Sequence, residues 1–303
     1  MSRPVTHQDG RTPKAARPDN RHRGRRTKKL VIIFAVLAAL LVGADFGLAA
    51  IAEHTVSQKA AEQLKLTDDP SVTIHGFPFS TQAIGGEYGH ISVSAAGVPV
   101  GDPARNVALR DVELKAELRN VTAPLSDLIN GDTSAIKIGD LTGQVRIKAS
   151  DIARIEPLTQ VQDLRIEPAS EEYVRTGDEG TDNNGSTPTT QPEDNDDSSA
   201  GVRISGNLQF AGEQLEIFCF AMIELDGTTI RITPQRLQFG NNQNTTIVDQ
   251  AVQKALLPNF KAEIDAGALP FKVTPTAVKV ESGSVTLQGE AKDLTFSGLS
   301  AGG

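Results

Sequence analysis

The chain has 303 residues with one Cys, no Trp, two Tyr and a formal net charge of −8 at pH 7. One cysteine excludes an internal disulfide and a cysteine-based zinc site, and so little Trp and Tyr disfavours a carbohydrate-binding module, which commonly stacks aromatic faces on sugar rings. The eleven Phe residues favour an apolar interior instead.

The charge is unevenly distributed along the chain. Residues 1–29 hold ten of the 30 Lys and Arg residues but only two of the 38 Asp and Glu residues, so the remainder has a net charge of about −16. Nucleic acid requires a basic face that neutralises phosphates, and an anionic membrane surface also attracts cations. The main part of the chain is therefore not expected to bind nucleic acid, and its contacts with lipid have to be apolar or local.

Residues 30–52 form an apolar segment with a single charge, Asp45. The segment is long enough to span a bilayer, and the cationic tail before it predicts a cytoplasmic N-terminus. We expect a single-pass anchor in the cell membrane, with the main domain, residues 53–299, in the periplasm or cell envelope. Ala50-Ile51-Ala52 also matches a signal-peptidase site, so a cleaved signal sequence is the alternative.

The main domain has the pattern of antiparallel β-structure. Apolar residues from Val112 to Leu118 alternate with charged ones, which is typical of a strand with one face in water. The dipeptide Asp226-Gly227 between two apolar runs predicts a hairpin. Helices are expected over residues 53–66 and, with Thr246 as N-cap, over residues 246–257. Strands and helices do not alternate, which disfavours a parallel nucleotide-binding sheet.

Residues 176–200 contain no large apolar side chain and predict a disordered acidic loop within the domain. The loop lacks the residue spacing of an EF-hand calcium site, and we predict no metal and no cofactor for the chain.

No catalytic motif is present: the chain lacks the nucleophile elbow, the P-loop, the dinucleotide fingerprint and the zinc-protease helix. The histidines after the apolar segment, His54, His75 and His90, are isolated in the sequence. We therefore predict that the protein is not an enzyme. A lipid-modifying hydrolase is the alternative that a convergent Ser/His/Asp cluster in an apolar groove would support.

Residues 214–225 are apolar on both faces of the predicted strand, with Phe218, Phe220 and Met222 on one of them. An antiparallel strand normally has one hydrated face, so either a second layer covers these three residues or they line an apolar cavity. Gly76-Phe77-Pro78-Phe79 and Leu269-Pro270-Phe271 each place an aromatic residue after a proline. Their Phe side chains are either exposed tips that touch lipid or plugs of the core.

Three segments carry a family resemblance: GFPFSTQ at residues 76–82, GEYGHISVSAAGV at residues 86–98 and LPFKVTPTAVKVESGSVTLQGEAKDLTF at residues 269–296. They resemble the actinobacterial LmeA-like family of cell-envelope phospholipid-binding proteins, over about residues 45–298. The resemblance implies an α+β fold, with an N-terminal membrane helix and then an elongated curved antiparallel β-sheet wrapping one or two long helices. It also implies binding of phospholipid, with phosphatidylinositol as a candidate, and a role in the assembly of envelope lipoglycans such as lipomannan.

Together these observations predict a non-enzymatic protein that shields acyl chains in an apolar groove. The candidate lipid-binding residues are Phe77, Phe79, Phe218, Phe220, Met222 and Phe271. The alternative is an envelope scaffold with a fully packed core that recruits partner proteins.

Overall fold

The computed structural model describes residues 23–64, 66, 68–102, 107–130, 132, 135–177, 197–210, 212–227, 229–239, 246–247, 249–265 and 274–295. The chain divides into two units, Met1–Phe46 and Gly47–Gly303.

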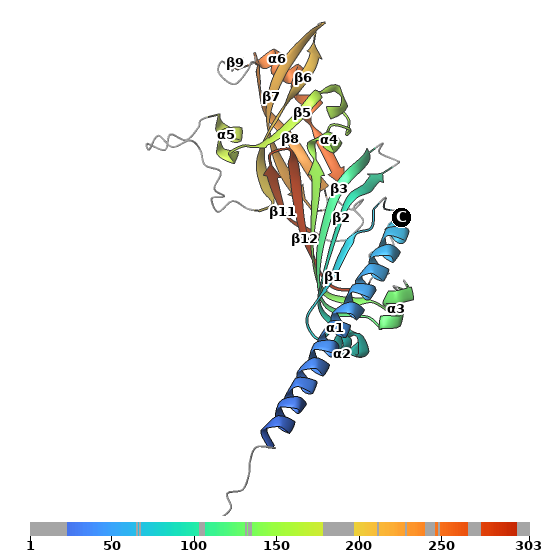
Figure 1. Cartoon of the computed structure of the whole chain (residues 1–303). Coiled ribbons are helices and arrows are strands. Elements are labelled where there is room, and N and C mark those ends of the chain that lie inside the picture. The colour runs from blue at the N-terminus through green and yellow to red at the C-terminus, as the bar shows by residue number, and fades with distance from the viewer. Residues whose placement is uncertain are drawn as a thin grey trace, which may run out of the picture. The chain divides into compact units, whose positions relative to one another are not determined.

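Helix α1 (Arg23–Leu64) makes up the described part of the first unit and continues into the second (Figure 1). The apolar segment and the helix predicted after it are thus one uninterrupted helix. From Val31 to Ala44 its side chains are exposed all round, although most of them are apolar. Among the described residues this helix is long and apolar enough to cross a membrane, a property that membrane anchors and N-terminal signal sequences share.

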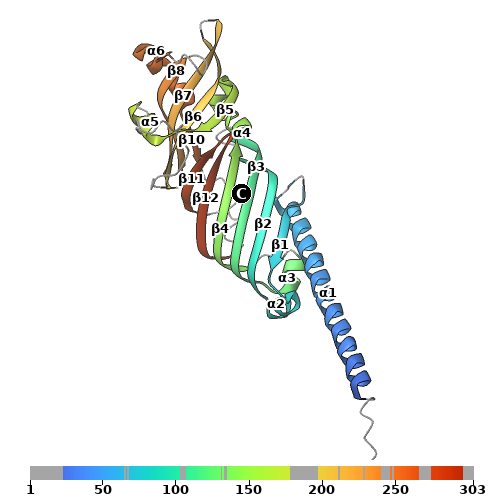
Figure 2. The ribbon, with the colours of Figure 1, turned by 60° about the vertical axis from the view of Figure 1, so that its left-hand side comes forward.

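The second unit contains a first antiparallel sheet of six strands, in the order β1-β2-β3-β4-β12-β11 (Figure 2). Long strands pair over most of their length, and the alternation of buried and exposed side chains continues across the sheet. The strands are β1 (Ser71–His75), β2 (Glu87–Asp102), β3 (Val107–Thr122), β4 (Lys137–Lys148), β11 (Thr274–Glu281) and β12 (Ser284–Thr295).

A second antiparallel sheet has the order β10-β8-β7-β6-β5, and the short strand β9 pairs with β8. The hairpin predicted at Asp226-Gly227 joins β7 to β8, with Gly227 at a φ of 60°, where glycine carries no steric penalty. These strands are β5 (Gln162–Pro168), β6 (Ser199–Phe210), β7 (Glu213–Asp226), β8 (Thr229–Phe239), β9 (Thr246–Ile247) and β10 (Ala262–Asp265).

The remaining helices of the described residues are short and lie at strand ends. They are α2 (Phe79–Gly85), α3 (Leu125–Asn130), α4 (Ala149–Ile152), α5 (Glu171–Thr176) and α6 (Gln250–Leu256), with the 3₁₀ helices η3 (Leu158–Gln160) and η4 (Leu257–Phe260). The prediction of a helix over residues 246–257 was wrong at its start. Thr246 and Ile247 pair with β8 instead, and the Asp249 side chain caps α6 by accepting from the Ala251 N–H.

The core of the second unit has two main parts. The larger cluster joins the two sheets, with side chains such as Val112, Ile147, Ile204 and Leu237. The other part covers the rest of the first sheet and packs against α1 and α2. The α+β class, the N-terminal apolar helix and the curled antiparallel sheets are confirmed. Sheets that wrap long helices are not, since strand side chains and short helices fill the larger cluster.

A row of irregular residues crosses the part of the first sheet that belongs to the second cluster. Asn120 in β3 and Asp293 in β12 have φ values of 53° and 52°, and both lie opposite Gly139 of β4. A Cβ atom on Gly139 would lie only 2.9 Å from the Asn120 Cβ, so a larger residue does not fit there. Beyond this row the buried residue in β4 is Ile138, out of step with the alternation from Leu141 onwards.

The prediction of an acidic loop over residues 176–200 was wrong at both ends. Thr176 belongs to α5, Gly177 caps that helix, and Ser199 and Ala200 begin β6. Residues 178–196 and the predicted lipid contact Phe271 lie outside the described residues.

Candidate functional site

Strand β7 buries apolar side chains on both faces, as its sequence indicates. Ile217, Cys219, Ala221 and Ile223 point into the core between the sheets. On the opposite face Phe218, Phe220 and Met222 are at most 6% exposed, in a separate cluster with Val174 and Tyr173 of α5. We call Phe218, Phe220, Met222, Val174 and Tyr173 the α5 cluster.

Helix α5 is the layer that covers this face, and polar contacts hold it there. The Ser170 side chain caps its N-terminus, and Arg236 of β8 donates to the carbonyl oxygens of Tyr173 and Val174 at 3.2 and 3.3 Å. Gln238 Nε2 donates to the Tyr173 hydroxyl at 3.0 Å. Helix α5 has only six residues and is attached to the sheet mainly through hydrogen bonds. Exposing this face of β7 therefore requires the displacement of only about one and a half helical turns.

Two arginines border the α5 cluster. Arg203 of β6 and Arg236 of β8 lie directly across from Phe220, one on each side. The Arg203 guanidinium lies 5.9 Å from the centre of the Phe218 ring, and Arg203 Nε donates to Glu167 at 2.8 Å. Apolar side chains with two neighbouring guanidinium groups match the chemistry of a phospholipid, which has acyl chains and a phosphate.

Sequence reasoning missed Arg203, Arg236 and Tyr173. Any signal was weak, because Arg203 is the one cation of β6 but β8 holds both Arg231 and Arg236. The position of Arg203 and Arg236 beside Phe220 depends on the register of three strands and on a register irregularity between Phe220 and Ala221, which no single segment specifies.

Glycine 201 of β6 makes room for the chain that leads into α5. A Cβ atom at Gly201 would lie 2.4 Å from the carbonyl oxygen of Ala169 and 3.1 Å from the backbone nitrogen of Glu171. The Ala169 N–H donates to the Gly201 carbonyl oxygen at 3.0 Å. The close approach of the two backbones therefore requires glycine at this position.

The Phe-Pro-Phe corner separates its two aromatic residues. Phe77 is 59% exposed, whereas Phe79 begins α2 and is buried beside Tyr88, with ring centres 6.4 Å apart. Phe79 and Tyr88 belong to the cluster on the first sheet, not to the α5 cluster. The described candidate residues therefore fall into two separate places, and the structure does not bring them together in one groove.

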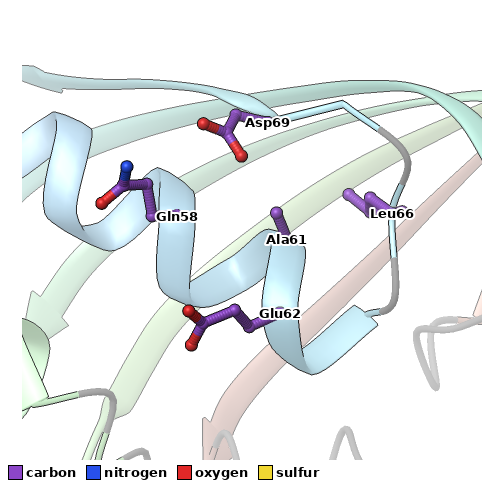
Figure 3. Close-up of a pocket in the computed structure, with 5 residues that line it drawn as sticks. All are labelled: Gln58, Ala61, Glu62, Leu66 and Asp69. Atoms are coloured by element: carbon purple, nitrogen blue, oxygen red, sulfur yellow. The ribbon is translucent and has the colours of Figure 1, made fainter.

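An open pocket of about 490 Å³ lies between the C-terminal part of α1 and the segment before β1 (Figure 3). Gln58, Ala61, Glu62, Leu66 and Asp69 line it. Two carboxylates and one large apolar side chain are a poor match for an acyl chain or a phosphate, so this pocket is not the candidate lipid site.

A Ser/His/Glu cluster lies on the outer, solvent-facing side of the first sheet. Ser92 Oγ donates to Glu117 Oε2 at 2.8 Å, and His75 Nε2 lies 2.7 Å from Ser92 Oγ. The ring of His90 stacks on that of His75 at 4.3 Å. Because the Ser92 proton goes to Glu117, His75 has to donate to Ser92 and does not act as its base. The cluster is also outside any apolar groove of the described residues, so it does not support a hydrolase.

The described part of the chain shows neither a metal-binding cluster nor a reactive thiol. No group of three or more His, Cys, Asp or Glu residues there is arranged to hold a metal ion. Cys219 is fully buried in the core, and burial raises the pKa of its thiol far above the ordinary value, which leaves it unreactive.

These features define an α+β protein with an N-terminal apolar helix, two curled antiparallel sheets and an apolar cluster bordered by cations. The family model of LmeA-like phospholipid-binding proteins matches residues 43–290, so the chain belongs to the LmeA-like phospholipid-binding family and carries its lipid-binding domain. No curated protein and no solved structure matches the chain.

Proposed function

We propose that the protein is a non-enzymatic phospholipid carrier of the cell envelope that holds acyl chains against Phe218, Phe220 and Met222 of β7. The observation that carries this proposal is the row Arg203–Phe220–Arg236, in which an apolar surface and two cations meet under one short helix. In the loaded protein α5 is displaced, acyl chains cover the apolar face, and the phosphate lies beside the two guanidinium groups.

The energetic purpose of such a carrier is to keep acyl chains out of water. Each exposed CH₂ group costs about 0.8 kcal/mol, so a chain of about sixteen carbons costs on the order of 12 kcal/mol. Displacing α5 from its hydrogen bonds and its small cluster costs much less, because only Val174 and part of Tyr173 leave the apolar face.

The finer assignments follow from the sequence and from the family. Phosphatidylinositol is the proposed lipid, and support of envelope lipid or lipoglycan assembly, such as that of lipomannan, is the proposed role. Residues 30–52 anchor the chain with its N-terminus in the cytoplasm and its main domain in the periplasm. Phe77, Phe79 and Phe271 are proposed as further lipid contacts at the two proline corners.

A packed scaffold that recruits partner proteins is the second candidate. The observation that favours it is the burial of Phe218, Phe220 and Met222 beneath α5, since a cluster already filled by protein side chains needs no ligand. The two candidates differ in whether the α5 cluster ever contacts lipid.

The experiment is photo-crosslinking in the full-length protein. The protein is extracted with a mild detergent, native mass spectrometry weighs any retained lipid, and a phosphatidylinositol with a diazirine in its acyl chain is then added and irradiated. We expect retained phospholipid and adducts on the β7 peptide, residues 213–226. If lipid is retained but the adducts lie elsewhere in the domain, the lipid site is not on β7. If no lipid is retained and the adducts are confined to α1, the scaffold is favoured.

Three variants sharpen this test. Phe220→Leu keeps the surface apolar and should retain lipid. Phe220→Asp places a carboxylate between Arg203 and Arg236, where it is partnered, so the fold should survive by circular dichroism while the phosphate and the acyl chain are excluded. Arg236→Gln should weaken lipid retention without removing the acyl contacts.

A further inference from the structure

Exposed large apolar side chains of the second unit gather at one end of the first sheet. Outside α1, the described residues of this kind are Phe77 at 59%, Ile84 at 89% and Ile129 at 43% exposure. Single exposed apolar residues are common on any protein surface, but three from three different segments at one place are characteristic of an interaction site.

The strand register places the three residues at the same end. β1 and β3 end there and β2 and β4 begin there, because His75 pairs with His90 and Val121 pairs with both Tyr88 and Ile138. Phe77 follows β1, Ile84 lies on α2 between β1 and β2, and Ile129 lies on α3 between β3 and β4. Figures 1 and 2 both show α2 and α3 side by side at this end.

The part of α1 that directly precedes Glu53 lies at the same end of the first sheet. Within the second unit α1 runs antiparallel to β1: the Ser57 hydroxyl donates to the Pro70 carbonyl oxygen, and Glu53 Oε1 accepts from the Ile74 N–H at 2.6 Å. Residues of α1 that precede Glu53 are therefore next to the end of β1 and the start of α2, and Ala49 belongs to the same cluster as Phe79. Leu48 and Ile51, on this part of α1, are exposed too.

The low charge of this end of the first sheet indicates which kind of partner it contacts. Residues 76–86 contain no charged residue, in a domain with a net charge of about −15, and α3 contributes only Asp127. If this end bound a protein through the acidic character of the domain, it would carry acidic side chains. If it bound an anionic headgroup layer, it would carry cations. Uncharged apolar tips are suited to the boundary between headgroups and acyl chains.

We propose that Phe77, Ile84 and Ile129 form a docking surface that inserts into the lipid bilayer and holds this end of the domain at the membrane. The proposal goes beyond the carrier function, because it concerns where the domain rests and not where a lipid is held.

The test measures the depth of single labels in the full-length protein. Ile84→Cys, Ile129→Cys and Gln250→Cys are each labelled with an environment-sensitive fluorophore, and the native Cys219 stays unlabelled because it is buried. The proteins are reconstituted in phosphatidylcholine vesicles with or without brominated acyl chains. We expect brominated lipid to quench the labels at positions 84 and 129 and to leave the label on α6 at position 250 unquenched, with the reverse order for aqueous iodide.

A further label position tests whether insertion depends on the apolar side chain of Ile84. With the label at Phe77→Cys, the added change Ile84→Asp should abolish quenching by brominated lipid, whereas Ile84→Leu should preserve it. Labels at positions 84 and 129 that iodide quenches as strongly as the label at position 250 would overturn the proposal. Labels that neither quencher reaches would also overturn it, because they would indicate that a second copy of the chain covers these residues. Lipid retention is measured on the same samples, so failure of docking is distinguished from failure of the carrier function.

Discussion

Phe77 and Phe79 are separated by one proline, yet the side chain of Phe77 is 59% exposed and that of Phe79 is 4% exposed. The difference arises because the chain leaves β1 before this point and begins α2 at Phe79. Two residues two apart in a strand would share a face, but here a turn and a helix start intervene. One corner thus supplies both a plug for the core and a tip at the surface.

This relationship predicts effects of very different size for two matched substitutions. Phe79→Ala should lower the free energy of unfolding by about 3–5 kcal/mol, because it leaves a cavity beside Tyr88. Phe77→Ala should change it by about 1 kcal/mol or less, since more than half of that residue is exposed. Thermal and denaturant unfolding of the two variants measures both values. Equal losses would mean that Phe77 is packed in the folded protein.

The sequence predicted those features of the fold that local patterns determine. The hairpin at Asp226-Gly227 and the apolar character of both faces of β7 follow from alternation and turn residues, and the α+β class follows from the family resemblance. The nature of the layer over Phe220 did not follow, because α5 is a six-residue helix positioned by contacts from Arg236 and Gln238, which lie more than sixty residues away in the chain.

The overestimated helix at residues 246–257 has a similar cause. The apolar stripe from Ile247 onwards fits a helix, but pairing with β8 takes Thr246 and Ile247 into a strand, and tertiary contacts of this kind override local preference. The two groups of candidate lipid residues likewise lie in different clusters, since sequence spacing gives no information on which sheet a corner packs against.

Tyr88 predicts a substitution that stabilises the protein. Its side chain is 1% exposed, and its hydroxyl has no hydrogen-bond partner among the described residues. Burial also raises the pKa of the phenol above its ordinary value. Tyr88→Phe removes an unsatisfied buried group and should raise the free energy of unfolding by about 1–2 kcal/mol. Loss of stability in denaturant unfolding would show that the hydroxyl has a partner in the folded protein.

Glu117 predicts a dependence of stability on pH. Hydrogen bonds from His90 and then from Ser92 lower the pKa of its carboxyl below the ordinary value of 4.5. A lowered pKa in the folded state contributes stability above the ordinary value, and this contribution is lost as the pH falls through the folded-state pKa. The difference in unfolding free energy between the wild type and Glu117→Gln should therefore be largest above pH 4.5 and shrink below it.

The effect at Glu117 should be small, because the cluster is exposed to solvent and screened by salt. Ser92→Ala removes one of the two hydrogen bonds and should move the carboxyl titration part of the way back towards its ordinary value. A carbon NMR titration of the Glu117 carboxyl group follows this directly. An unchanged midpoint in Ser92→Ala would show that the Ser92 hydroxyl does not bind Glu117 in solution.

Gly201 and Gly143 provide a matched pair that tests how α5 covers β7. A Cβ atom at Gly201 would meet the Ala169 carbonyl oxygen at 2.4 Å, whereas the nearest atom to a Cβ at Gly143 is the Gly289 carbonyl oxygen at 3.9 Å. Both substitutions to Ala restrict the unfolded chain equally, so the difference between them reports the clash. Gly201→Ala should push the backbone before α5 outwards and lower the free energy of unfolding by about 1–3 kcal/mol, with Gly143→Ala close to neutral.

The displacement of α5 in Gly201→Ala has a second readout. Arg175 lies on α5 and is exposed, so trypsin should cleave after it faster in Gly201→Ala than in the wild type or Gly143→Ala. If the α5 cluster holds acyl chains, the same variant should also exchange phospholipid faster, because the cover that has to leave is already loosened. Equal cleavage and equal stability in the two variants would mean that the chain leading into α5 does not rest on β6 in solution.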